Sequence, residues 1–338
     1  MHELSFKFCK SFIFIILIIY LTFINYFSGL YLLENKNIEY DLIIPCSLSD
    51  IKLFFQNKIY YDKYINYSNI ILIGESSISK LIKNESSISF ISEDFLVSKK
   101  NINEFLLKMR NISTDRDGWY EQQFLKMAYS YICKKDYYLI WDADTIPIKS
   151  IQMFKNNHPF FDMKTEHHIP YFNTIKKLIP GLKFKERSYI SEHMMIRTEF
   201  MRNLLLKIEL NEQLAGKFFW EKILMSIDIQ DMNFSGFSEY ETYGAYVDSE
   251  YPYTYRHRNW FSLREANTYF GNSKNLNKDD INWLSKYYHA ISFEKVNIFE
   301  EKYLNIVKSS HIQKLYKSNF VFNNFKKIFM KYIKSNIL

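Results

Sequence analysis

DYYLIWDADTIP, residues 136–147, is the stretch of the chain that most directly indicates its fold. Residues 136–141 are largely apolar and aromatic, the composition of a buried strand. Two carboxylates, Asp142 and Asp144, follow at once, and Pro147 then interrupts the pattern. In parallel sheets, ligands bind beyond the carboxyl ends of the strands. We therefore predict a strand over 136–141 that delivers Asp142 and Asp144 to a ligand site.

The spacing of Asp142 and Asp144 also suggests which ligand they bind. At i and i+2 on a regular strand, both side chains point to the same face. Neighbouring carboxylates repel each other unless a positive charge lies close to both. A hard divalent cation supplies that charge and completes its shell with phosphate and water, so that it can stabilise a departing nucleotide diphosphate. The pair predicts a Mn²⁺ or Mg²⁺ site, and turn or cap residues without a ligand are the alternative.

Apolar runs and helical patterns alternate on the N-terminal side of this segment. Strands are expected over 40–45, 69–74 and 87–91, and helices over 51–60, 101–109 and 118–133. Strands separated by helices favour a largely parallel sheet with crossover helices. The expected fold class is therefore α/β, with a mixed, mostly parallel sheet.

A phosphatase of the haloacid-dehalogenase type uses a similar acidic pair. Its first Asp is the nucleophile of a D-x-D-x-[TV] motif in the first strand. Here the last motif position is Ile146, and the pair lies far into the chain. Both departures argue against a phosphatase, which is kept as a third alternative.

The helix predicted before this strand carries polar residues at helical spacing. Gln122 and Lys126 share one face at i and i+4, and Trp119 and Gln123 share the neighbouring face. Amides and a lysine near a helix N-terminus can bind the hydroxyls or phosphates of a donor. The alternative is an ordinary solvated amphipathic helix.

Two segments downstream contain candidate catalytic residues. Glu192 and His193 are expected on a strand, as a base or an acceptor contact, although a satisfied core histidine is equally consistent with the pattern. Glu239 and Glu241 flank Tyr240 among other aromatic residues. Aromatic rings stack on sugars, and a partly buried carboxylate with a raised pKa can deprotonate an attacking hydroxyl. We predict Glu239, Glu241 and His193 as catalytic residues, and Glu192 and Tyr240 as substrate contacts.

A basic segment lies at residues 255–260. Arg256 and Arg258 can neutralise phosphate, and His257 can complete the shell of the metal ion. A basic turn on the surface is the alternative.

Four ordered motifs together resemble a known family. They are GWYxQQxxK over 118–126, DADT over 142–145, SEHM over 191–194 and SEYExYG over 238–244. The combination is similar to that of a mainly bacterial family of largely uncharacterised glycosyltransferases of the GT-A type. The resemblance covers roughly residues 40–260. It implies a GT-A-like domain with a Rossmann-like nucleotide-binding half, a D-x-D metal site and a nucleotide-sugar donor, and it leaves the acceptor and the stereochemistry open.

Composition excludes some classes of protein. Lys and Arg residues are spread along the whole chain rather than clustered on one element, which argues against a nucleic-acid partner. The excess of basic over acidic residues is concentrated after Lys302, in a segment for which contact with an anionic membrane surface is expected and an ordinary solvated helix is the alternative. The three cysteines, Cys9, Cys46 and Cys133, lack metal-ligand spacing and indicate no disulfide framework, so we expect buried free thiols.

The N-terminal region predicts a membrane anchor. Residues 11–33 contain no charged side chain, and this length suffices to cross a bilayer with some tilt. A cleaved signal peptide is the alternative. Lys7 and Lys10 before the span leave the side of the membrane open. The expected organisation is a short tail (1–10), an anchor (11–33), a GT-A-like domain (34–300) and a basic, amphipathic tail (301–338).

These patterns together predict a metal-dependent, membrane-anchored glycosyltransferase. It would move a sugar from a nucleotide-sugar donor to a glycan or lipid-linked acceptor in surface polysaccharide or glycoconjugate synthesis. A non-catalytic, membrane-tethered carbohydrate-binding scaffold is the alternative from another class, because the many aromatic residues, 18% of the chain, would also suit glycan binding.

Overall fold

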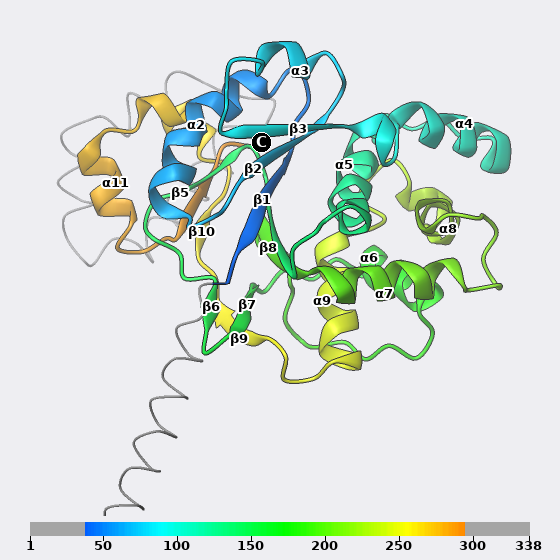
Figure 1. The fold of residues 1–338 in the computed structure, drawn as a ribbon. Helices are drawn as coiled ribbons and strands as arrows, with labels where there is room; N and C mark the ends of the chain where they lie inside the picture. The colour runs from blue at the N-terminus through cyan, green and yellow to red at the C-terminus, as the bar shows by residue number, and fades with distance from the viewer. Residues whose placement is uncertain (1–37, 295–338) are drawn as a thin grey trace, which may run out of the picture. The chain divides into compact units, whose positions relative to one another are not determined.

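A computed structural model of the protein describes residues 38–294 (Figure 1). The predicted anchor over 11–33 and the predicted tail over 301–338 lie outside these residues. Between residues 38 and 294, no helix is long and apolar enough to span a bilayer. The described residues form two compact units: the first contains 38–48, 66–142 and 152–260, and the second contains 49–65, 143–151 and 261–294.

The main sheet of the first unit has five strands. They are β1 (Tyr40–Pro45), β2 (Ile70–Gly74), β3 (Ile88–Ser92), β4 (Tyr137–Trp141) and β8 (His193–Arg197). Their order is β3-β2-β1-β4-β8, in which the first four are parallel and β8 runs antiparallel to β4 (Figure 1). The prediction of an α/β fold with a mixed, mostly parallel sheet is confirmed.

The direction in which strands are added reverses between β1 and β4. The chain moves outward from β1 through β2 to β3, and it then returns to place β4 on the other side of β1. Such a reversal leaves a crevice at the carboxyl ends of the two strands, where open α/β sheets bind ligands. β4 ends at Trp141, so Asp142 is the first residue beyond it at this crevice.

The central strands consist mostly of apolar residues, and they are stabilised by burial on both faces of the sheet. β1 and β2 are buried along their whole length, as continuous apolar runs in parallel sheets usually are. Leu42 pairs with Ile70 on one side and with Leu139 on the other, which sets the register of the three strands. β3 lies at the edge of the sheet and is only partly buried.

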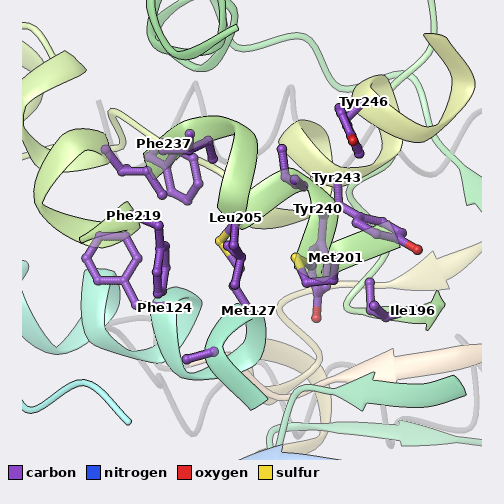
Figure 2. Packing of buried hydrophobic residues seen from close by; sticks show 14 of the residues in the cluster. Phe124, Met127, Ile196, Met201, Leu205, Phe219, Phe237, Tyr240, Tyr243 and Tyr246 are labelled. Carbon is purple, nitrogen blue, oxygen red and sulfur yellow. The ribbon is translucent and has the colours of Figure 1, made fainter. Parts of the chain in front are cut away.

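Helices pack around this sheet in the first unit. They are α3 (Ile78–Leu81), α4 (Lys99–Arg110), α5 (Asp117–Ala128), α6 (Ile169–Leu178), α7 (Thr198–Glu209), α8 (Phe219–Ser226) and α9 (Glu239–Glu250). α5 contacts β1 and α9, and α7 contacts β8 and α9. Figure 2 shows the core between them, where Phe124 packs against Phe219 and Phe237 with ring centroids 6.0 and 6.1 Å apart. The helix predicted over 118–133 ends earlier, because the 3₁₀ turn η2 (Tyr129–Tyr131) follows α5.

A small second sheet completes the first unit. It consists of β6 (Phe154–Lys155), β7 (His158–Met163) and β9 (Arg256–Asn259), and β7 and β9 are parallel. The alternative of a basic turn over 255–260 is therefore wrong, because most of this segment is strand β9. Cys46 and Cys133 are buried, and neither forms a disulfide bond within residues 38–294, which agrees with the prediction of buried thiols.

The second unit has its own sheet and its own core. Its elements are α2 (Ile51–Tyr64), β5 (Thr145–Pro147), β10 (Ser262–Leu263), α10 (Asn267–Phe270), η4 (Ser273–Asn275), α11 (Lys278–Leu284) and β11 (Ala290–Ser292). β11 is antiparallel to β5 and parallel to β10. Ile146, Leu284 and Ile291 belong to the core of this unit. Pro147 does not simply end the pattern that precedes it, because it is the last residue of β5.

The tight contact between α9 and the loop before β8 gives a first prediction. A methyl group on Gly244 would overlap the ring of the buried Tyr189. We expect Gly244→Ala to lower the free energy of unfolding by about 1–3 kcal/mol, measured by urea unfolding. Gly118→Ala in α5 is the matched control, because its nearest neighbour would be Lys99 Nζ at 3.8 Å. Equal stability of the two variants would contradict this packing.

Candidate functional site

A buried lysine joins two carboxylates beside the carboxyl end of β4. Lys126 Nζ lies 2.7 Å from Asp142 Oδ1 and 2.7 Å from Glu239 Oε1. The Lys126 and Glu239 side chains are 3% and 5% exposed, and that of Asp142 is 24% exposed. Tyr240 donates its hydroxyl to Asp142 Oδ1 at 3.3 Å, and its ring lies 4.6 Å from Lys126 Nζ. We call these four residues the Lys126 cluster.

Three elements bring the cluster together. Lys126 lies in the last turn of α5, and Glu239 is the first residue of α9. The N-terminus of α9 is capped by Ser238, whose Oγ accepts a hydrogen bond from Glu241 N at 3.2 Å. Gln123, one turn before Lys126, accepts a hydrogen bond from Glu239 N at 3.1 Å. α5 and α9 are therefore locked together next to the end of β4.

The charges in the cluster depend on burial. Burial by itself would lower the pKa of Lys126, but the carboxylates of Asp142 and Glu239 outweigh it and raise this pKa, so the lysine keeps its proton. Burial raises the pKa of Glu239, against the opposing effect of Lys126. Burial also raises the pKa of Tyr240 well above its ordinary value. The cluster therefore contains two carboxyl groups for one protonated lysine.

Upstream of the cluster, α5 is not the solvated helix of the alternative interpretation, because Gln123 and Lys126 are both buried. Gln123 Nε2 also donates to the carbonyl of Trp119 at 3.4 Å. Trp119 is half-buried, with its ring 4.6 Å from the guanidinium carbon of Arg116. Gln122 is half-buried as well. Trp119, Gln122, Gln123 and Lys126 were the substrate-binding residues predicted on this helix, and the structure brings Gln123 and Lys126 to the acidic residues.

Glu192 borders the Lys126 cluster in an unusual backbone conformation. It precedes β8 rather than lying in it, and its φ of 58° is in the left-handed region. Its carbonyl accepts a hydrogen bond from Asp142 N at 3.0 Å. Its buried carboxylate accepts hydrogen bonds from Lys164 Nζ and from Trp260 Nε1, the latter at 3.1 Å. Backbone strain of this kind persists where the surroundings fix it, and it is frequent at functional sites.

His193 is held by partners on both ring nitrogens. Nδ1 lies 2.7 Å from the carbonyl oxygen of Ser191, and Nε2 lies 2.9 Å from Asp162 Oδ2. The ring packs against Trp141 and Trp260, with centroids 4.8 and 4.3 Å apart. Because both nitrogens face oxygen acceptors, neither presents a lone pair to a substrate. The predicted catalytic role of His193 gains no support from this geometry, which fits a positioning role.

The basic segment of β9 is divided between two faces. Arg258 forms a bidentate pair with Asp162 at 2.6 and 2.7 Å, so a carboxylate already neutralises it. His257 points to the other face, as strand alternation requires, and lies 2.8 Å from Asp248 Oδ2. Arg256 Nε is buried and has no hydrogen-bond partner among residues 38–294. The structure therefore gives His257 an acidic partner other than Asp142, and the predicted metal-ligand role of His257 gains no support.

Glu241 lies apart from Glu239 although both are in the first turn of α9. Its Oε2 accepts hydrogen bonds from Ser188 Oγ at 2.8 Å and from Tyr189 N at 3.2 Å. Burial raises the pKa of Glu241 to about 7. The side chain therefore stabilises the loop that leads to Glu192, and the structure does not bring it to Asp142.

The raised pKa of Glu241 predicts how stability changes with pH. The folded protein binds the Glu241 proton more tightly than the unfolded chain does. The contribution of this protonation to the free energy of unfolding therefore falls as pH rises from about 4.5 to about 7. We expect Glu241→Gln to flatten this slope and to raise the free energy of unfolding at pH 8 by about 1–3 kcal/mol relative to the parent. Urea unfolding at pH 5 and pH 8 measures the effect. Glu104→Gln makes the same change at an exposed position on α4 and is the control. An unchanged slope in Glu241→Gln would contradict the prediction.

The second acidic residue, Asp144, belongs to the second unit. Asp142 and Asp144 are both partly exposed, whereas Trp141, Ala143 and Thr145 are buried. Asp144 Oδ1 accepts a hydrogen bond from Thr145 Oγ1 at 3.2 Å.

The donor atoms of Asp142 and Asp144 fit a hard divalent cation. Both residues offer only carboxylate oxygens, and the cation would take its other ligands from phosphate and water. In the part of the chain that the structure describes, no group of three or more His, Cys, Asp and Glu residues is arranged to hold a metal ion. The acidic pair would therefore have to share the ion with a bound ligand.

Comparison with known proteins identifies the family. Residues 59–324 match a family of unknown function, DUF6492. The chain belongs to the DUF6492 family. No curated protein matches it.

Several solved structures are similar to this DUF6492 chain. The galactosyltransferase LgtC, in complex with donor and acceptor sugar analogues, matches with a TM-score of 0.38 and 10% identity, over 75% of this chain and 86% of that one. The bifunctional WbbM matches with a TM-score of 0.41 and 9% identity, over 78% and 47%. GlyE from Streptococcus pneumoniae TIGR4 matches with a TM-score of 0.33 and 10% identity, over 88% and 64%. At these values the similarity does not establish an activity for the DUF6492 chain.

Two charged residues of this region were not predicted from the sequence. Asp162 and Lys164 hold His193 and Glu192, respectively. A signal was present, because Asp162 follows the aromatic pair Phe160-Phe161, much as Asp142 follows an apolar run. Asp162 lies near the end of β7 and Lys164 directly follows it, so a search for polar residues at the ends of apolar strands would have found both.

Proposed function

We propose that this protein is a GT-A-type glycosyltransferase that uses a nucleotide-sugar donor. The observation that carries the proposal is the position of Asp142, which directly follows β4 where the strand order reverses and is held by the buried Lys126. Ligands of α/β sheets bind at such a reversal, and an acidic residue there suits a cation bound to a diphosphate. All four residues of the Lys126 cluster lie within three of the four sequence motifs, which also supports the proposal.

We propose further that the segment Asp142-Ala143-Asp144 binds Mn²⁺ or Mg²⁺. The ion would neutralise charge on the departing nucleotide diphosphate. Lys126 neutralises part of the charge on Asp142 and fixes the orientation of its carboxylate. It binds through Oδ1, which leaves Oδ2 on the partly exposed side chain to face a ligand.

Glu239 is the residue that we propose as general base if the reaction inverts the anomeric centre. Its burial raises its pKa, and a carboxylate with a raised pKa accepts a proton more readily. Its contact with Lys126 holds it beside Asp142. Glu192 and Tyr240, which border the same cluster, are the proposed substrate contacts.

The location and the acceptor are proposals that rest on the sequence. We propose that residues 11–33 anchor the protein in a membrane and that the basic segment 301–338 contacts anionic lipid. β1 begins at Tyr40, shortly after the end of the proposed anchor, which would keep the sheet near the bilayer. This arrangement suits an acceptor that is a glycan or is lipid-linked.

A binding experiment with the full-length protein in detergent tests the proposal. Nucleotide-sugars are titrated by calorimetry with and without Mn²⁺, and release of free sugar is followed in the same samples. We expect one donor to bind more tightly with Mn²⁺ and to be hydrolysed slowly. Binding of glycans with no binding of any nucleotide-sugar would instead establish a scaffold, and release of phosphate from simple esters would indicate a phosphatase.

A further inference from the structure

The backbone between the two aspartates is held by a helix far away in the sequence. The carbonyl oxygen of Ala143 accepts hydrogen bonds from Asn57 Nδ2 at 2.9 Å and from the hydroxyl of Tyr61 at 3.0 Å. Asn57 and Tyr61 are one turn apart in α2, so they point to the same side of the helix. Both side chains are fully buried, with no exposed surface. The two acceptor sites of this carbonyl are therefore both used by side chains of the second unit.

The donors to Ala143 are themselves fixed in orientation. Asn57 Oδ1 accepts a hydrogen bond from the buried Ser273 Oγ at 2.7 Å, which sets the direction of the amide so that its nitrogen faces Ala143. Ser273 belongs to η4, so the network joins α2, η4 and the acidic segment. Such fully satisfied buried networks hold one arrangement of the backbone, because breaking any bond leaves a buried polar atom unpaired.

The backbone on the other side of Asp144 is held as well. The carbonyl oxygen of Asp144 accepts a hydrogen bond from Phe293 N at 2.8 Å. Thr145 Oγ1 lies 2.8 Å from Ser292 Oγ, and both residues are buried. Asp144 therefore projects its carboxylate from a short segment with both neighbouring peptide groups fixed.

We propose that Asn57 and Tyr61 are positioning residues that aim the Asp144 carboxylate at a divalent cation. This inference rests on the proposed function, since it presumes that the acidic pair binds the ion. Neither residue touches the carboxylate, and both act through the carbonyl of Ala143. Metal ligands must be held within a fraction of an ångström, and partners that orient a ligand typically change metal affinity by 10–100-fold when they are removed. An asparagine used only to stabilise α2 would have no such effect.

The test measures Mn²⁺ affinity of the full-length protein directly. Free Mn²⁺ is quantified by electron paramagnetic resonance for the parent, for Asn57→Ala and for Tyr61→Phe, and thermal unfolding is recorded for each. Tyr61→Phe keeps the buried ring and removes only the oxygen that contacts Ala143. Tyr60→Phe is the matched control, because it removes a hydroxyl from the same helix. Tyr60 packs against the core of the second unit, and Ala143 is not part of that core.

We expect Asn57→Ala and Tyr61→Phe to weaken Mn²⁺ binding about tenfold or more, and we expect Tyr60→Phe to bind as the parent does. If Tyr61→Phe binds Mn²⁺ as tightly as the parent, the positioning role is wrong while the proposed metal site stands. A lower unfolding temperature with unchanged affinity also refutes it, because it shows a purely structural contact. If the parent itself binds no Mn²⁺ with or without a nucleotide-sugar, the proposed metal site fails and this inference fails with it.

Discussion

Lys126→Met should lower the free energy of unfolding by about 3–5 kcal/mol, the range observed when one partner of a buried ion pair is removed. The substitution keeps a long, unbranched side chain but leaves Glu239 buried without a counterion, and Asp142 loses the same partner. Urea unfolding at pH 7 measures the loss. Because Glu239 can relieve its burial by taking up a proton, we expect the loss to be smaller at pH 5 than at pH 7.

Two further variants separate this effect from a general cost of losing a lysine. Lys207→Met removes a lysine that pairs with Glu250 at 3.0 Å, with both side chains about 40% exposed. Exposed pairs of this kind contribute about 0–1 kcal/mol. The double variant Lys126→Met, Glu239→Gln should recover part of the loss, because the buried negative charge is gone. A loss below about 1 kcal/mol in Lys126→Met would contradict the ion pairs described for Lys126.

The positions of the central strands could be predicted because they depend on local composition. Residues 40–45, 69–74 and 136–141 are mostly apolar, and such stretches have few alternatives to burial in a parallel sheet. The antiparallel strand β8 was located only in part. Glu192 was expected within it, but Glu192 has a left-handed φ and the strand begins only at the next residue, His193. Nothing in the residue type Glu predicts that conformation.

The sequence motifs predicted single residues of the site but not the contacts between them. Asp142, Glu239 and Lys126 were each selected from short patterns, but their ion pairs join positions up to 113 residues apart. Spacing along one helix or strand cannot reveal such pairs. His257 shows the same limit, since strand alternation directs it to Asp248, and nothing in the residue pattern favours either face of β9. The bonds from Asn57 and Tyr61 to Ala143 likewise depend on tertiary packing alone.

Asp142→Asn should reduce the rate of sugar transfer at least about 100-fold, equivalent to about 3 kcal/mol of lost stabilisation of the transition state. Asparagine has nearly the same size, and its carbonyl oxygen can still accept the hydrogen bond from Tyr240. It removes the negative charge that we propose to hold the metal ion, and a neutral amide is a poorer ligand for a hard cation than a carboxylate. Lys126 keeps its ion pair with Glu239, so we expect the variant to stay folded.

The control for Asp142→Asn lies at the opposite end of the same strand. Asp136 directly precedes β4, and Asp136→Asn makes the same chemical change beyond the amino end of the strand. Transfer is measured with the donor found in the binding screen, together with the dependence of the rate on Mn²⁺ concentration. Asp136→Asn should keep the parent rate, whereas Asp142→Asn should require more Mn²⁺ and remain slow at saturation. Equal rates for Asp142→Asn and the parent would refute the role that we propose for Asp142, because that role depends on a charge that only the parent carries.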